Sequence, residues 1–286
     1  MNSITLSSSS MLARLSIGVY TGRVLDRKVT EEVATNKNAT GRVGNYHKKL
    51  FSDSPKLDKV IKLAANIRNW HQINTLPWED DGTRLLPTKH FFNHREQMGK
   101  YEEEFNQAVE DFLADYQSQI QIQANKLGDM FDLAEYPDVN SLRSKFRFCM
   151  GYSPVPEAGD FRVDINEDAK KELMERYEET YNARVEEAMS DAWGRLTKSF
   201  KHIVERLSPD AEGEDKVFRK SMLENLEELV EILPRFNITN DPKLNETCEW
   251  AKRLLGTVTA KELRENQKVR ANVRNELKEM LSKMEV

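Results

Sequence analysis

Residues 93–128 have the sequence NHREQMGKYEEEFNQAVEDFLADYQSQIQIQANKLG, in which apolar side chains recur at alternating steps of three and four residues. Residues 167–207, EDAKKELMERYEETYNARVEEAMSDAWGRLTKSFKHIVERL, repeat this pattern. Such spacing places the apolar side chains along one side of an α-helix, so we predict two helices. At about 1.5 Å per residue they reach roughly 50 and 60 Å. The two stripes are Met98, Tyr101, Phe105, Ala108, Val109, Phe112, Tyr116, Ile120, Ala124 and Leu127, and Leu173, Tyr177, Tyr181, Val185, Ala188, Ala192, Leu196, Phe200, Ile203 and Leu207.

Helices of this length predict a mainly α fold: an elongated bundle in which the two long helices pack antiparallel in the manner of a coiled coil, with a small α+β module. The connection, residues 129–165, is long enough to return the chain. It predicts a short helix over 139–146 and strands over 147–151 and 160–165, before Asn166 caps the second long helix. The expected domains are an N-terminal mixed module (1–92), the helical pair (93–208) and a C-terminal helical segment (209–286).

Shorter elements are predicted on both sides of the long helices. Ser54 before Pro55 indicates a helix start, because a serine hydroxyl caps free amides and proline has no amide to leave unpaired. Thr259 and Glu262 form a capping box before the final helix. The remaining expectations are an extended segment over 12–28, a helix from a Thr30 cap to about 50 with a break near Gly41 and Gly44, a turn-rich loop over 75–88, and helices over 214–233 and 242–255.

Composition favours an extended molecule with basic ends. Only 38% of the residues are apolar and 32% are charged, which is typical of long solvated helices. The net charge is +7 for residues 1–100, −9 for 101–140, −6 for 171–234 and +3 for 235–286. The acidic helices between basic ends predict intramolecular or head-to-tail charge pairing, and they restrict any nucleic-acid contact to the ends. We also expect a homo-oligomer.

Cysteine usage and the N-terminal sequence predict a cytoplasmic protein. Cys149 and Cys248 have no CxxC partner, so we expect reduced thiols. The first 20 residues combine neither a basic segment nor a sustained apolar one, and the chain has no run of 18 apolar residues. We therefore expect neither secretion nor a membrane span, and we expect the sequons at Asn38, Asn237 and Asn245 to be unmodified.

His90 and His94 lie four positions apart and would share one side of a helix, as zinc-binding histidines do. A third ligand would come from Asp80, or from His71, Glu79 or Asp81. The alternative is that both are ordinary half-buried histidines. The acidic group at 79–81 beside Trp78 likewise indicates either a Mg²⁺ or acid–base site or a solvated turn.

Nucleic-acid contacts are predicted at both basic ends. The sequence Gly41-Arg42-Val43-Gly44 precedes Tyr46, His47, Lys48 and Lys49, which resembles a phosphate-contact loop with an aromatic residue for stacking. A break between two helical segments has a similar sequence. The expected contacts are Arg42, Lys48 and Lys49 at this end, and Lys261, Arg264, Lys268, Arg270 and Arg274 on the final helix.

Several enzyme classes are excluded by their motifs. No GxxxxGKS/T sequence and no GxSxG sequence occurs, which excludes an autonomous P-loop ATPase and a standard serine hydrolase. Asp160-Phe161-Arg162 lacks the glycine and every other element of a kinase. We therefore expect no catalytic residue and no cofactor.

Four blocks, residues 26–33, 75–88, 134–148 and 154–164, resemble an uncharacterised family of phage, plasmid and integrative-element proteins. The resemblance covers most of the first 200 residues. Proteins of this family tend to be encoded near MoxR-type AAA ATPases and von Willebrand A-type proteins similar to cobaltochelatase subunits. The resemblance implies a helical partner that lacks its own nucleotide site.

The resulting expectation is a non-catalytic interaction or adaptor protein of a phage or mobile element that acts with an AAA ATPase. The alternative is a nucleic-acid-binding protein of phage recombination or replication. A metal-dependent enzyme around His90, His94 and Asp80 is the third hypothesis.

Overall fold

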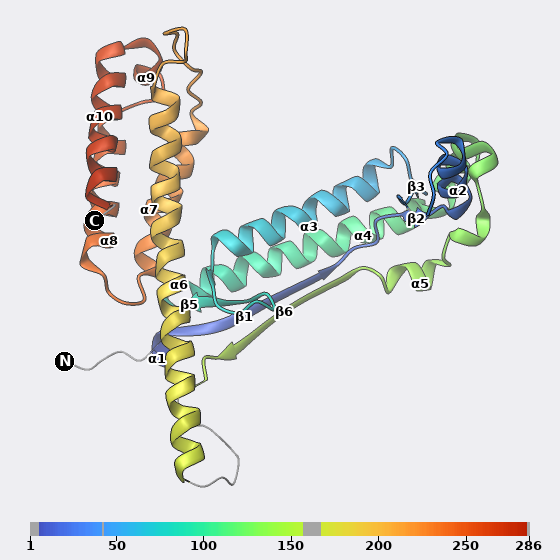
Figure 1. Ribbon diagram of the computed structural model, residues 1–286, viewed down its shortest axis with the longest axis horizontal. Coiled ribbons are helices and arrows are strands. Elements are labelled where there is room, and N and C mark those ends of the chain that lie inside the picture. Colours follow the sequence, from blue (N-terminus) through green and yellow to red (C-terminus); the bar gives the residue numbers. More distant parts are fainter. Residues whose placement is uncertain (1–5, 42, 157–166, 285–286) are drawn as a thin grey trace. The chain divides into compact units, whose positions relative to one another are not determined.

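A computed structural model describes residues 6–41, 43–156 and 167–284, and helices predominate in it (Figure 1). The mainly α class is thus confirmed. The helices are α1 (Leu6–Ser9), α2 (Arg27–Asn36), α3 (Pro55–Ile73), α4 (Phe91–Leu127), α5 (Val139–Arg143), α6 (Glu167–Leu207), α7 (Ser221–Phe236), α8 (Pro242–Thr257), α9 (Glu262–Glu265) and α10 (Gln267–Met284). The strands are β1 (Ser10–Gly18), β2 (Arg23–Leu25), β3 (His47–Lys49), β4 (Leu76–Pro77), β5 (Thr83–Pro87) and β6 (Arg147–Pro154).

The chain forms two compact units that alternate along the sequence. The first unit comprises residues 1–14, 72–94 and 151–286, and the second comprises 15–71 and 95–150. The boundaries fall inside β1, α3, α4 and β6, so these elements have residues in both units. This grouping does not follow the three consecutive segments predicted from the sequence.

Residues 75–88 form a β-hairpin, which corrects the predicted loop. Strands β4 and β5 are joined through Asp81 and Gly82, and the φ of +89° at Gly82 suits glycine. β5 pairs antiparallel with β1, with Ser10 opposite Pro87, within a four-stranded sheet of order β4-β5-β1-β6. Leu85 and Leu86 are fully buried, which explains why so short a strand is stable.

The core of the first unit is built from α6, α7, α8 and α10, and α6 also contacts β4. Its largest fully buried side chains include Phe200, Phe218 and Phe236. The predicted stop at Pro234 is two residues early, because α7 continues to the buried Phe236. The capping box is confirmed: the Thr259 amide donates to Glu262 at 2.9 Å, and the Glu262 amide donates to the Thr259 hydroxyl at 3.2 Å. A break at Asn266 then separates α9 from α10.

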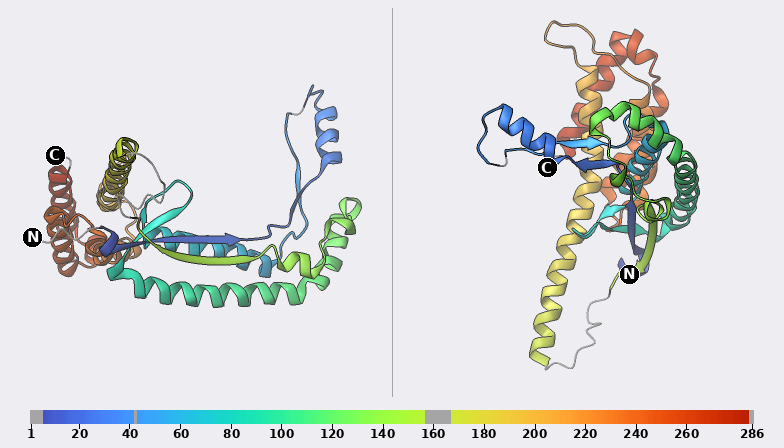
Figure 2. Two further views of the ribbon diagram at one scale, coloured as in Figure 1. Left: turned by 90° about the horizontal axis from the view of Figure 1, so that it is seen from below. Right: turned by 90° about the vertical axis from the view of Figure 1, so that its right-hand side faces the viewer.

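The core of the second unit lies mainly between α3 and α4, which are side by side (Figures 1 and 2). Ile67 of α3 and Phe105, Phe112 and Tyr116 of α4 are almost completely buried. Helix α3 begins at Pro55 as predicted. The Ser54 hydroxyl, however, is buried and has no hydrogen-bond partner among the described residues, so it does not cap the helix.

The two long helices are present, with 37 residues in α4 and 41 in α6. The predicted antiparallel pair of the two is not found among the described residues. Most of the α4 stripe is buried against α3 in one core, and the α6 stripe from Ala188 to Leu207 is buried against α7, α8 and α10 in the other. Leu173, near the start of the α6 stripe, remains 38% exposed. Because most of each apolar face is covered within its own core, little apolar surface is left to pair the two helices.

The segment from β2 to β3 corrects another expectation. Helix α2 is capped by Asp26 rather than Thr30 and ends at Asn36, ten residues before β3 begins. Asn38 has a positive φ of 52°, which stops the helix. The segment that returns to β3 stands beside α2 as a loop (Figure 2).

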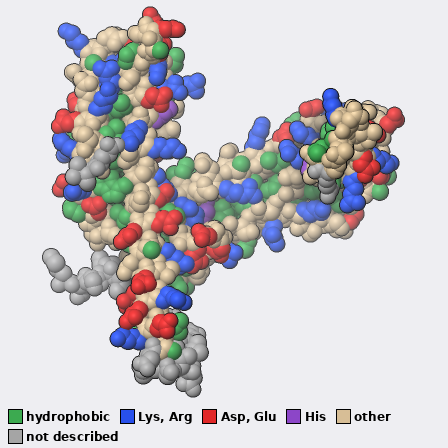
Figure 3. Space-filling view, viewed as in Figure 1, with side chains coloured by type: hydrophobic (Ala, Val, Ile, Leu, Met, Phe, Trp, Pro, Cys, Tyr) green, Lys and Arg blue, Asp and Glu red, His purple; other side chains and the backbone are tan. Residues whose placement is uncertain are grey.

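The remaining predictions are confirmed in outline. The short helix α5 and the strand β6 occupy the predicted connection, while Asn166, the strand over 160–165 and Asp160-Phe161-Arg162 lie outside the described residues. Acidic side chains are prominent along the N-terminal half of α6 (Figure 3), as the charge pattern predicts. No helix among the described residues is both long and apolar enough to cross a membrane.

Candidate functional site

The candidate site is a groove on the segment formed by β2, α2, the following loop and β3, residues 23–49, which we call the α2 module. The groove has a volume of about 740 Å³. It lies between α2 and the described loop residues Gly41 and 43–46. Its lining residues are Leu25, Arg27, Thr30, Glu31, Val33, Ala34, Gly41, Val43, Gly44, Asn45 and Tyr46.

The groove exposes apolar side chains that no other part of the described chain covers. Val33 is 52% exposed, Val43 is 71% exposed and Tyr46 is 42% exposed. Helix α2 has no fully buried residue, although its apolar side chains gather on one side. Apolar side chains that cluster at the surface of a monomer often mark a binding surface.

Hydrogen bonds fix the end of the groove at Tyr46. The Asp26 carboxylate accepts from the Val29 amide at 3.1 Å and so caps α2. The Thr30 hydroxyl donates to the Asp26 carbonyl oxygen at 2.6 Å and accepts from the Tyr46 amide at 3.0 Å. The Asp26 amide donates to the Tyr46 carbonyl oxygen at 2.9 Å. The backbone of Tyr46 is therefore fixed on both sides while its ring remains exposed.

Lys48 was predicted to contact nucleic acid, but it is a structural residue. Its side chain is only 6% exposed and forms ion pairs with Glu135 at 2.8 Å and Asp26 at 3.5 Å. Its ammonium group also donates to the Met130 carbonyl oxygen at 2.7 Å. Burial by itself lowers the pKa of Lys48, but the Glu135 and Asp26 carboxylates outweigh that effect and leave the pKa above its ordinary value.

The opposite face of the two-stranded β2–β3 ribbon is exposed and basic. Arg23 pairs with Lys49 and Leu25 pairs with His47 across the ribbon. Arg23, His47 and Lys49 are all exposed, and no salt bridge of Arg23 or Lys49 is found in the described part of the chain. Lys49 is thus available for contacts as predicted, and Arg42 lies outside the described residues.

The residues predicted to contact nucleic acid at the C-terminal end also divide into exposed and buried ones. Lys261, Arg264 and Lys268 are exposed, and Arg274 is half-buried. Arg270 is only 3% exposed, which corrects its assignment to nucleic acid. Its guanidinium donates to the carbonyl oxygens of four residues and pairs with Asp215 at 3.3 Å. The four acceptors are Leu207, Leu263, Arg206 and Lys216.

The structure does not assemble His90, His94 and Asp80 into a metal site. The Nε2 atom of His90 lies 2.9 Å from Asn74 Oδ1, and the Nδ1 atom of His94 lies 3.0 Å from the Tyr152 hydroxyl. Both rings are buried, whereas Asp80 is exposed. Across the described residues, no group of three or more His, Cys, Asp or Glu side chains is placed to hold a metal ion.

Glu79 and Asp81, the neighbours of Asp80, form contacts within the fold. The Asp81 carboxylate accepts from the Thr83 amide at 2.9 Å, which closes the hairpin turn. Glu79 forms an ion pair with Arg184 at 3.1 Å. The solvated-turn interpretation of this acidic group therefore accounts for its geometry better than a Mg²⁺ or acid–base site.

His90 is held neutral in the first unit. Arg235 donates to its Nδ1 atom at 3.3 Å, so the ring proton is assigned to Nε2, which faces the Asn74 amide oxygen. Burial, and secondly the positive charge of Arg235, lower the pKa of His90 from 6.5 to about 4. The group stabilises the fold only while it is uncharged.

This depressed pKa predicts a loss of stability in mild acid. The unfolded chain takes up the proton first, so the full stability is present above about pH 6.5 and is lost as the pH falls toward 4. From about pH 7.5 to about pH 5, we expect His90 to lower the free energy of unfolding by about 2 kcal/mol. Urea unfolding of the native protein and of His90→Gln at both pH values measures this effect. An equal pH dependence in the two proteins would contradict it.

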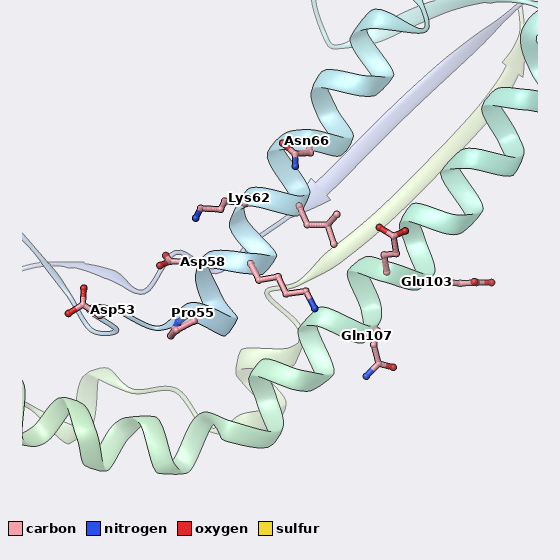
Figure 4. Close-up of a pocket in the computed structure, with 10 residues that line it drawn as sticks. Asp53, Pro55, Asp58, Lys62, Asn66, Glu103 and Gln107 are labelled. Atoms are coloured by element: carbon pink, nitrogen blue, oxygen red, sulfur yellow. The ribbon is translucent and has the colours of Figure 1, made fainter. Parts of the chain in front are cut away.

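A second groove, of about 1070 Å³, lies along α3 and α4 in the second unit (Figure 4). It is lined mainly by charged side chains, including Asp58, Lys62 and Glu103. Figure 4 shows that the side chains of Asp58 and Lys62 point away from α4 rather than toward Glu103. Because catalysis needs polar groups that converge on one point, this groove is a poor candidate for chemistry.

Arg23 and Val33 were not predicted from the sequence. Neither residue belongs to a motif, and each gains its importance only from the folded module. The register of β2 with β3 places Arg23 opposite Lys49, and Val43 of the returning loop lines the same groove as Val33.

No protein-family profile matches the sequence, and neither a curated protein nor a solved structure matches it. The resemblance of residues 26–33, 75–88, 134–148 and 154–164 to the phage and mobile-element family therefore stays a prediction. The groove and the basic ribbon face are supported by the geometry of this chain alone.

Proposed function

We propose that this protein is a non-catalytic interaction protein that binds a partner protein in the groove of the α2 module. The exposure of Val33, Val43 and Tyr46 on a module with a fixed backbone carries this proposal. A partner that covers these side chains removes apolar surface from water without having to order the groove first.

The proposed partner is an AAA ATPase of the MoxR type, acting in the cytoplasm of a bacterial host that carries the phage or mobile element. Support for this choice comes from the family resemblance, in which such ATPases are neighbours. A helical adaptor without a nucleotide-binding motif complements an enzyme that has one.

Val33→Asp combined with Val43→Asp is expected to weaken binding of a MoxR-type AAA ATPase by at least about 10-fold, because a buried unpaired carboxylate is costly. Co-expression followed by affinity capture and titration of the purified pair measures the effect. Val217→Asp is the matched control, because Val217 is 73% exposed in the other unit. Equal binding by the double variant and the native protein would exclude the groove as the contact.

The predicted homo-oligomer and elongated particle belong to the same proposal. Light scattering combined with small-angle X-ray scattering measures both properties in solution. A compact monomer that neither binds nor stimulates the ATPase would contradict the proposed function as a whole.

A further inference from the structure

Two cations, Arg23 and Lys49, lie on the outward face of the β2–β3 ribbon, and no structural role is found for them within the described chain. Cross-strand partners point to the same face of a ribbon, so the side chains of Arg23 and Lys49 lie next to each other. Leu25 and His47 follow on this face, because side chains alternate with a period of two. Val24 and Lys48 occupy the inner face, where Lys48 is buried.

The two outward cations are uncompensated because the inner lysine occupies the nearby carboxylates. Asp26 and Glu135 both pair with Lys48. The other carboxylates of the module, Glu31 and Glu32, lie on α2, and Glu31 lines the groove. Like charges directly opposite each other destabilise a β-ribbon, so the stability of the module does not account for Arg23 and Lys49.

The same module also carries an exposed aromatic ring. Tyr46 and Leu25 line one groove, and Leu25 shares the outward face with Arg23. Arg27 lines the groove as well and is exposed. An exposed ring and exposed cations without an ion pair among the described residues are the groups with which proteins bind single strands, with phosphates on the cations and a base on the ring.

We propose that the outward face of the β2–β3 ribbon, with Tyr46, binds single-stranded nucleic acid. Arg23, Arg27 and Lys49 contact phosphates, and Tyr46 stacks on an unpaired base. A duplex is disfavoured because its bases are already stacked and paired. This binding site is additional to the proposed contact with the ATPase and does not depend on it.

The test uses the full-length protein and fluorescein-labelled 20-mers of deoxythymidine and of uridine, with a 20-base-pair duplex as comparison. Three phosphate contacts predict a logarithmic salt slope of about −2, so affinity falls about 20-fold between 50 and 200 mM salt. Arg23→Glu with Lys49→Glu is expected to weaken single-strand binding by more than about 10-fold and to flatten the salt slope. Tyr46→Ala is expected to weaken it by about 10-fold with little change in the slope. The two homopolymers distinguish DNA from RNA as the source of the strand.

The matched control is Lys243→Glu with Lys278→Glu, which reverses two exposed lysines in the C-terminal segment that were not predicted to contact nucleic acid. Native-like binding by this control, with thermal unfolding of all variants unchanged, supports the ribbon as the site. Absence of single-strand binding at low salt, tighter binding of the duplex, or an equal loss in the control would overturn the proposal.

The Val33 and Val43 variant separates this proposal from the proposed function. Loss of ATPase capture with retained single-strand binding confirms two separate contacts. If Arg23→Glu with Lys49→Glu weakens ATPase capture while no nucleic acid binds, the cations form the rim of the protein groove, and the nucleic-acid proposal is wrong.

Discussion

Arg270→Ala is expected to lower the free energy of unfolding of the first unit by about 3–5 kcal/mol, the usual cost of leaving a buried ionic network without one member. The guanidinium lies beside the C-terminal end of α6. Because Arg270 is only 3% exposed, water cannot replace it as the hydrogen-bond donor. Its shortest hydrogen bond, to the Arg206 carbonyl oxygen, measures 2.6 Å. Without it, several backbone carbonyl oxygens lose their donor, which is more costly than the loss of the ion pair with Asp215.

Denaturant unfolding followed by circular dichroism measures this effect. Lys268→Ala is the control, because this exposed side chain two positions earlier should change the free energy by no more than about 0.5 kcal/mol. Arg270→Lys retains the charge but not the planar fork, so an intermediate loss is expected. Equal unfolding midpoints for Arg270→Ala and Lys268→Ala would contradict a structural role for Arg270.

Lys48→Met is expected to destabilise the α2 module by about 3 kcal/mol, because it leaves the Asp26 and Glu135 carboxylates without their shared cation. Methionine preserves most of the length of the side chain, so lost packing contributes little. Lys49→Met is the matched control, because it makes the same substitution at the adjacent, exposed position. It should lower the free energy of unfolding by no more than about 0.5 kcal/mol.

Hydrogen exchange of the backbone amides in residues 23–49 measures the local effect of Lys48→Met. Faster exchange confined to the module is the expected result. A larger effect from Lys49→Met than from Lys48→Met would show that the inner and outer faces of the ribbon are assigned in the wrong order.

The sequence predicted the long helices well because their signal is repeated over many turns. Each of α4 and α6 carries ten apolar positions in phase, so a single exception does not obscure the pattern. Their packing partners were not predictable in this way. An apolar stripe shows that a face will be buried, but α3 covers α4, and α7, α8 and α10 cover α6, because of tertiary contacts that the stripe does not encode.

Short elements were predicted less well, because only a few residues carry the pattern of each one. Strand β5 has only five residues and follows a run of turn-forming residues, and four of the five are buried, so it lacks the alternation of apolar and polar residues that predicts a strand. The helix expected from Thr30 to about 50 was wrong because the alternative cap Asp26 lies four residues earlier. Competing caps of similar strength cannot be ranked from local sequence alone.

The candidate site illustrates the same limit at the level of single residues. Lys48 and Lys49 are adjacent and chemically identical, yet one is buried in an ion-pair network and the other is exposed. Only the register of β2 with β3 decides which lysine points inward, because a shift of one residue exchanges the two faces. Arg270 was misassigned in the same way, since its charge was visible in the sequence and its burial was not.

The most direct test of the proposed binding surface is hydrogen exchange of the full chain, measured with and without a MoxR-type AAA ATPase. The account predicts slower exchange over residues 27–46, where Val33, Val43 and Tyr46 line the groove, and unchanged exchange in α7 and α8. Protection of α7 and α8 with no change over residues 27–46 would contradict the assignment of the α2 module as the binding surface.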